Sequence, residues 1–122
     1  MENQGQLHRS GSVTLDANGN GTITVMPDNA RQRWEVRRIA VSTNQSATAT
    51  NIPVVQPFVN DVLSQAAARG ASWSGNQDIL DTLIHVGPCD VLNLVFSPGP
   101  GGAAPGVIAS ATFEGDYFTR RT

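Results

Sequence analysis

The chain has 122 residues, enough for one domain with a single modest core. Eight basic and ten acidic residues give a formal net charge of -2, which disfavours a general binder of nucleic acid or of anionic membranes. The one cysteine, Cys89, excludes an intrachain disulfide, and the Cys and His pattern is unlike a zinc site, so no cofactor or metal is expected.

Apolar residues recur mostly with a period of two, which is typical of strands with one buried face. The stretch from Ser12 to Val25 predicts a hairpin of two strands around a polar loop, Asp16 to Gly21. If the apolar residues of both strands share one face, Leu15 lies opposite Ile23 or Val25. Either pairing predicts a loop with an odd number of residues.

The longest predicted strand runs from Arg31 to Thr43. Its first apolar pair, Trp34 and Val36, is even-numbered, whereas its second pair, Ile39 and Val41, is odd-numbered. One extra residue reverses the alternation of a strand, so a β-bulge at the two adjacent arginines between these pairs would return both to the core. We therefore predict a bulge there.

The second half of the chain gives weaker signals. Ile52 to Val59 reads as an edge or bulged strand, because Pro53 and Pro57 donate no ladder hydrogen bond. Asn60 to Gly75 is compatible with a short helix or an irregular loop, and we favour the loop. Three further strands are predicted, with a long Gly/Pro-rich loop before the last: Ile79 to Val86, Asp90 to Phe96 and Val107 to Phe118.

These elements predict an all-β fold, an antiparallel β-sandwich of jelly-roll-like architecture with about seven or eight strands. A single domain is expected over residues 12–118. Residues 1–11 are expected to form an N-terminal segment and residues 119–122 a polar tail.

Two motifs suggest chemistry and are incomplete. Asp16 to Gly21 matches the first half of a calcium loop, but the position of the bidentate Glu is Pro27, so a turn is favoured. A local cluster of polar residues lacks the second His, Ser or Lys that would complete a catalytic geometry. No catalytic residue and no enzyme activity are therefore predicted from its members, Asp78, Asp81, His85, Cys89 and Asp90.

Two features are candidates for binding a partner. Arg31, Arg33 and Arg37 face away from Trp34, and arginine is well suited to pairing with carboxylates across an interface. This stripe is the first candidate for a protein contact, and a solvated face is the simpler interpretation. Trp73, in a Gly/Asn-rich connection, is a candidate exposed anchor for a partner or a sugar, with a cap on the core as the simpler interpretation.

Four segments carry a resemblance to a known group of proteins: Val13 to Thr22, Arg33 to Thr43, Gly75 to Asp78 and Pro105 to Gly115. Together they resemble small structural proteins encoded by tailed phages of actinobacteria, among their head and tail genes. Such proteins often have an aromatic residue before the Gly-rich loop, whereas this chain has Phe96-Ser97, a mild departure.

This resemblance implies a virion structural protein, made in the host cytoplasm, and first of all a capsid decoration or head-surface protein. The implied partners are the major capsid protein or other virion proteins, together with further copies of the chain. A trimer is expected, because decoration proteins often occupy threefold positions of a capsid lattice. The alternative is a tail or tail-tip module that binds a host surface glycan, with Asn76 and Asp78 near Trp73.

Overall fold

A computed structural model describes residues 2–46, 48–60, 62–63, 77–99 and 101–120. The residues in these ranges form strands, turns and loops, and none of them is helical. Within this part of the chain there is accordingly no helix that is long and apolar enough to cross a membrane. The strands are β1 (Glu2–Thr14), β2 (Gly21–Val25), β3 (Gln32–Thr43), β4 (Val54–Val59), β5 (Val62–Leu63), β6 (Gln77–Val86), β7 (Leu92–Ser97) and β8 (Ile108–Arg120).

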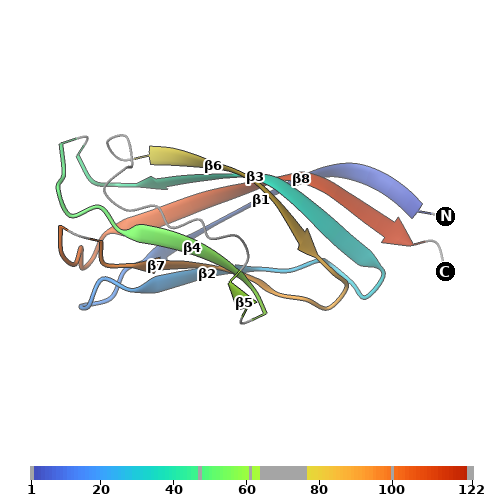
Figure 1. Cartoon of the computed structure of the whole chain (residues 1–122), viewed down its shortest axis with the longest axis horizontal. Helices are drawn as coiled ribbons and strands as arrows, with labels where there is room; N and C mark the ends of the chain where they lie inside the picture. Colours follow the sequence, from blue (N-terminus) through green and yellow to red (C-terminus); the bar gives the residue numbers. More distant parts are fainter. Residues whose placement is uncertain (1, 47, 61, 64–76, 100, 121–122) are drawn as a thin grey trace.

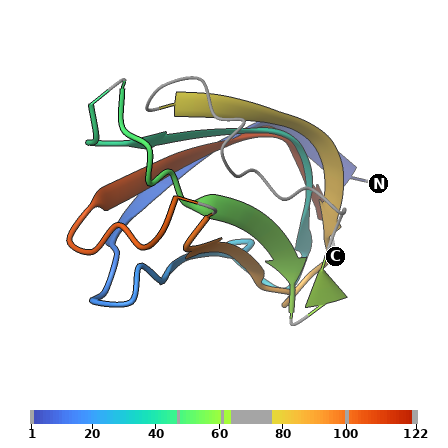
Figure 2. The same cartoon turned by 60° about the vertical axis from the view of Figure 1, so that its left-hand side comes forward.

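The strands form two four-stranded sheets that lie in two layers (Figure 1, Figure 2). One sheet has the order β1-β8-β3-β6 and the other β2-β7-β4-β5, and every pairing is antiparallel. The predicted all-β sandwich is therefore confirmed. Both chain ends lie at the same end of the molecule (Figure 1).

The core lies between the two sheets and follows the period-two pattern. In β7, Leu92, Leu94 and Phe96 are fully buried and alternate with half-buried residues. Trp34 on β3 is 1% exposed, and its indole Nε1 donates to Oε1 of Gln32 at 2.9 Å. The same oxygen accepts a hydrogen bond from the amide of Asp28 at 2.9 Å. Gln32, a buried polar residue, thus ties the loop before β3 to the largest core side chain.

The predicted bulge in β3 is confirmed. Val36 pairs with Gly115 of β8 and Arg38 pairs with Glu114, so Arg37 is the extra residue. The register between β3 and β6 shifts at the same level. Trp34, Val36, Ile39 and Val41 are all buried, as the change of parity requires.

Gly115 is the residue of β8 that allows this bulge. A Cβ at this position would overlap the carbonyl oxygen of Glu35 and lie 2.9 Å from the amide nitrogen of Arg37. Both obstacles are backbone atoms, which a side-chain rotation cannot move. The close approach of the bulged strand therefore requires glycine here.

The predicted hairpin of β1 and β2 is wrong, because the two strands belong to different sheets. β1 pairs with β8 and β2 pairs with β7, and the chain crosses between the layers through residues 15–20. Leu15 and Ile23 are both buried, so they contribute to one core from opposite sheets. Alternation identified the buried faces but not the pairing partners.

The expected chain ends also need correction. Residues 2–11 were assigned to a segment outside the domain, but they form most of β1 and pair with β8. The apolar signal is weak because small residues take inward positions: Gly5 lies where a Cβ would overlap the ring of Tyr117. β8 continues to Arg120, beyond the expected start of the tail at residue 119.

The strand predicted from Ile52 begins two residues later, as β4. β5 covers only Phe58 and Val59 of β4, so the remainder, including Pro57, is an edge among the described residues, as predicted. Most of the segment predicted as a loop, Asn60 to Gly75, lies outside the described residues.

Candidate functional site

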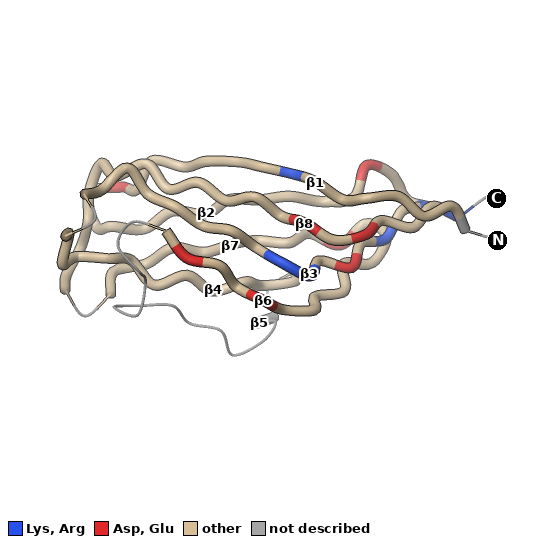
Figure 3. The backbone as a smooth tube through the Cα atoms, turned by 90° about the horizontal axis from the view of Figure 1, so that it is seen from above, with Lys and Arg blue, Asp and Glu red and all other residues tan. Residues whose placement is uncertain are grey.

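Charged side chains are distributed unequally between the two sheets. β2, β4, β5 and β7 contain no charged residue. The charges on strands gather instead on the sheet formed by β1, β8, β3 and β6 (Figure 3). The most concentrated group lies where β3 and β8 run side by side around the bulge.

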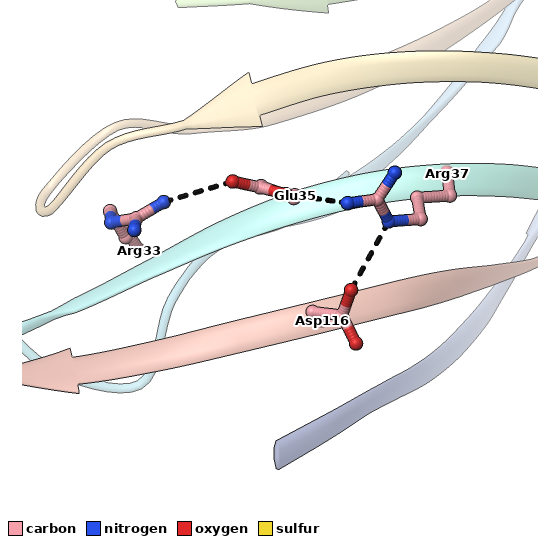
Figure 4. A network of polar contacts seen from close by, with 4 residues as sticks. All are labelled: Arg33, Glu35, Arg37 and Asp116. Carbon is pink, nitrogen blue, oxygen red and sulfur yellow. Dashed lines mark hydrogen bonds and ion pairs between the residues drawn. The ribbon is translucent and has the colours of Figure 1, made fainter. Parts of the chain in front are cut away.

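Glu35 is the centre of this group (Figure 4). Its carboxylate accepts a hydrogen bond from Arg33 Nη1 at 3.2 Å and another from Arg37 Nη2 at 2.8 Å. Arg37 Nε also donates to Oδ2 of Asp116 on β8 at 3.1 Å. The Glu35 side chain is 18% exposed and that of Arg37 is 55% exposed, so the guanidinium is the member presented to solvent. We call Arg33, Glu35, Arg37 and Asp116 the arginine network.

The bulge is the structural cause of this arrangement. In a regular strand Arg37 and Arg38 would point to opposite faces, but here both are exposed. Arg38 Nε lies 3.6 Å from Oε1 of Glu114, and the other oxygen of Glu114 lies 3.9 Å from Nδ1 of His8 on β1. Polar contacts therefore connect three neighbouring strands on one face.

The chemistry of this surface favours contact with a protein over binding of an anion. The ion pairs of Arg33, Arg37 and Arg38 on this face have carboxylates of the same chain as partners, so their positive charge is largely neutralised. Exposed ion pairs of this kind contribute only about 0–1 kcal/mol each to stability. The face thus presents fixed charges of both signs, which suits selection of a complementary protein surface.

The structure brings together only part of the arginine stripe. Arg33 and Arg37 share the network, and both face away from the buried Trp34 as predicted. Arg31 lies in the turn before β3, where its amide donates to Oδ1 of Asn29 at 2.9 Å. Trp73, the candidate exposed anchor, lies outside the described residues, as does Asn76.

The local cluster of polar residues is spread over separate positions. Asp81 and His85 are exposed on β6, where Asp81 pairs in register with Arg38 and His85 with Glu35. Cys89 is exposed in a turn with a φ of 66°. Asp90 caps that turn by accepting the amide of Gly87 at 3.0 Å. Among the described residues, no three His, Cys, Asp or Glu side chains are grouped to hold a metal ion.

In the loop with partial similarity to a calcium site, the Asp16 carboxylate accepts hydrogen bonds from the backbone of the loop itself. Oδ1 of Asp16 accepts the amides of Asn18 at 2.8 Å and Asn20 at 3.0 Å. Gly19 has a φ of 81°, which a residue without a Cβ adopts at little cost. Asp16 therefore holds the crossing between the sheets, as expected of a turn.

Sequence reasoning missed a depression on the same outer face as the network. It has a volume of about 590 Å³ and is open to solvent. Its lining includes Ala40, Ser42 and Ser110, together with the charged residues Arg38 and Asp78. The signal in the sequence was the run of small residues at alternate positions of two strands.

The sequence matches no protein-family model, and no curated protein matches it. The fold does match solved structures. A chain in the acid-stable capsid structure of Helicobacter pylori bacteriophage KHP30 is similar with a TM-score of 0.54 and 11% identity, over 97% of this chain and 93% of that one. A weaker similarity is to dimeric latent PorU from Porphyromonas gingivalis, with a TM-score of 0.43 and 12% identity, over 85% of this chain and 11% of that one. The first similarity shows a shared fold with a phage capsid chain over nearly the whole length of both.

Proposed function

We propose that this chain is a non-enzymatic structural protein of a bacteriophage virion, and specifically a capsid decoration or head-surface protein. The observation that carries the proposal is the similarity in fold to a chain of a phage capsid, which extends over 97% of this chain and 93% of that one. The match thus extends over nearly the whole of both chains and not over a shared fragment. The resemblance of the sequence to phage structural proteins is an independent reason.

The strand order supports this proposal. The pairs β1 with β8, β2 with β7, β3 with β6 and β4 with β5 are those of one long antiparallel ribbon rolled into two layers. The remaining pairs, β3 with β8 and β4 with β7, close the roll. We infer that this is the eight-stranded jelly roll, which occurs repeatedly in viral capsid proteins.

We propose the arginine network, extended by Arg31, as the surface that contacts the major capsid protein or another virion protein. Arg37 is anchored through Glu35 and Asp116 at 2.8 and 3.1 Å, so little side-chain freedom is lost when it meets a carboxylate of a neighbour. Arginine is also enriched at protein interfaces. A trimer at a threefold lattice position is the proposed assembly.

The test adds purified protein to particles prepared without it. We expect saturable binding to the particle surface. Arg33→Glu with Arg37→Glu should abolish binding while the fold is retained, because outward charges act mainly on association. A swap, Arg37→Glu with Asp116→Arg, restores a pair within the chain but presents reversed charges to a neighbour. Full binding by the swapped variant would exclude the network as the contact, and absence of any binding by the wild type would contradict the decoration role.

A tail module that binds a host glycan is the second candidate function. The observation that favours it is the open depression whose lining includes Asp78, because hydroxyl, amide and carboxylate groups surround it. Binding of host surface glycans that is lost in Ser42→Leu, with no binding to heads, would favour the tail role over the decoration role.

A further inference from the structure

β1 presents a long strand edge to which no other strand is bonded in the described structure. It spans Glu2–Thr14 at the end of its sheet and pairs with β8 on one side. Its register with β8 is unbroken over the whole length. Edge strands are usually shortened, bulged or fitted with proline or lysine, because unpaired backbone groups attract other chains. β1 is neither short nor bulged and contains no proline or lysine, and the one inward-facing charge along it is Arg9.

The direction of the free backbone groups follows from the residue after the strand. The amide of Leu15 donates to the carbonyl of Val107 at 2.8 Å, and its carbonyl accepts the amide of Gly106 at 2.9 Å. Leu15 therefore directs its backbone groups toward β8. Residues of an antiparallel strand alternate between its two sides, so the even-numbered residues direct theirs to the open edge. These residues are Glu2, Gln4, Gln6, His8, Ser10, Ser12 and Thr14.

The side chains along this edge are uncharged over most of its length. The six even-numbered residues from Gln4 to Thr14 are exposed on the outer face, and five of them are amides or hydroxyls. Arg9 faces inward instead, where it forms an ion pair with Asp28 and lies 5.7 Å from the centre of the Trp34 ring. Between Gln4 and Thr14, the even-numbered positions of the open edge therefore carry no carboxylate or arginine that would repel an identical edge.

We propose that β1 pairs antiparallel with β1 of a second copy across a two-fold axis, which joins the two four-stranded sheets into one. An identical strand has the same length and twist, and facing rows of amides and hydroxyls are self-complementary. A register centred at His8 places Arg9 opposite Leu7 of the other copy, so the two arginines do not meet directly. Such a register forms about ten main-chain hydrogen bonds, two for each hydrogen-bonded residue pair.

This contact does not rest on the proposed virion role. It is a property of the isolated chain in solution, and its two-fold symmetry separates it from the proposed threefold assembly through the arginine network. Failure of one proposal therefore leaves the other standing.

A cysteine scan tests the pairing. In a Cys89→Ser background, which removes the exposed native thiol, single cysteines replace Gln4, Gln6, His8, Ser10 and Ser12. Disulfide-linked dimer should peak at one position, which marks the axis, and fall at positions two residues away. Ser110→Cys and Thr112→Cys are controls on the same face of β8. Yields on β1 no higher than on β8 would overturn the pairing.

A proline at the edge gives a second, independent test. Ser10→Pro removes an amide that points to the open edge and leaves the ladder with β8 intact, whereas Ser10→Ala keeps that amide. We expect both variants to melt alike, while the dimer dissociation constant of Ser10→Pro rises by about tenfold or more relative to Ser10→Ala. Equal dissociation constants in two folded variants would contradict the proposal; if Ser10→Pro does not fold, the cysteine scan decides.

Discussion

Deletion of Arg37 tests the bulge that positions both the core and the arginine network. Without the extra residue, β3 alternates regularly, so either Trp34 and Val36 or Ile39 and Val41 must turn outward. All four side chains are at most 2% exposed in the native fold. Exposure of a fully buried apolar side chain costs about 1.5–3 kcal/mol, so exposure of one pair costs about 3–6 kcal/mol.

The matched control is Arg37→Ala, which keeps the bulge and removes the side chain. Arg37 is 55% exposed, so loss of its two ion pairs, at about 0–1 kcal/mol each, should lower stability by no more than about 2 kcal/mol. Urea denaturation of both variants measures the difference, with the slope of the transition checked for constancy. If the free energies of unfolding of the deletion variant and of Arg37→Ala differ by less than about 1 kcal/mol, the bulge does not set the parity of β3 and the reasoning is refuted.

Three further predictions concern the fold. Gly115→Ala should lower the free energy of unfolding by about 1–3 kcal/mol, because its Cβ meets backbone atoms of β3. Ser110→Ala on the same strand should change it little, and equal free energies of unfolding for the two variants would refute the close approach. Trp34→Ala should cost about 3–5 kcal/mol, and an unchanged melting temperature would contradict its burial. Gln32→Leu should lower the free energy of unfolding by about 1–3 kcal/mol, because the Asp28 amide and the Trp34 indole both lose their acceptor. Gln32→Glu keeps the acceptor, so calorimetry should find it more stable than Gln32→Leu.

The buried faces of the strands were predictable because burial imposes a local period. The change of parity between Val36 and Ile39 was sufficient to predict the bulge, since no regular strand buries both pairs. The strand with which a given strand pairs is not determined by a local pattern of this kind. β1 and β2 are adjacent in the sequence with a turn between them, yet each pairs with a strand from the far end of the chain. The length of the ladder between β1 and β8 determines this choice of partners, and no short sequence motif encodes the choice.

The candidate site was predicted only in part for a similar reason. The outward direction of Arg33 and Arg37 follows from alternation within β3, but Asp116, which accepts a hydrogen bond from Arg37, lies 79 positions away in the sequence. Gly5 and Gly115 gave no apolar signal, although one accommodates the ring of Tyr117 and the other the bulged backbone. These roles depend on packing between residues far apart in the sequence, and a pattern of residue types along one strand carries no information about such packing.

The number of copies per particle tests the proposed virion role most directly. Intact particles are purified, and quantitative mass spectrometry measures this chain relative to the major capsid protein. A decoration protein that follows the capsid lattice predicts a ratio set by the lattice symmetry, with copies on the order of hundreds in each particle. Absence of the chain from purified particles would contradict a virion role, and a count of only a few copies would exclude decoration in favour of the tail.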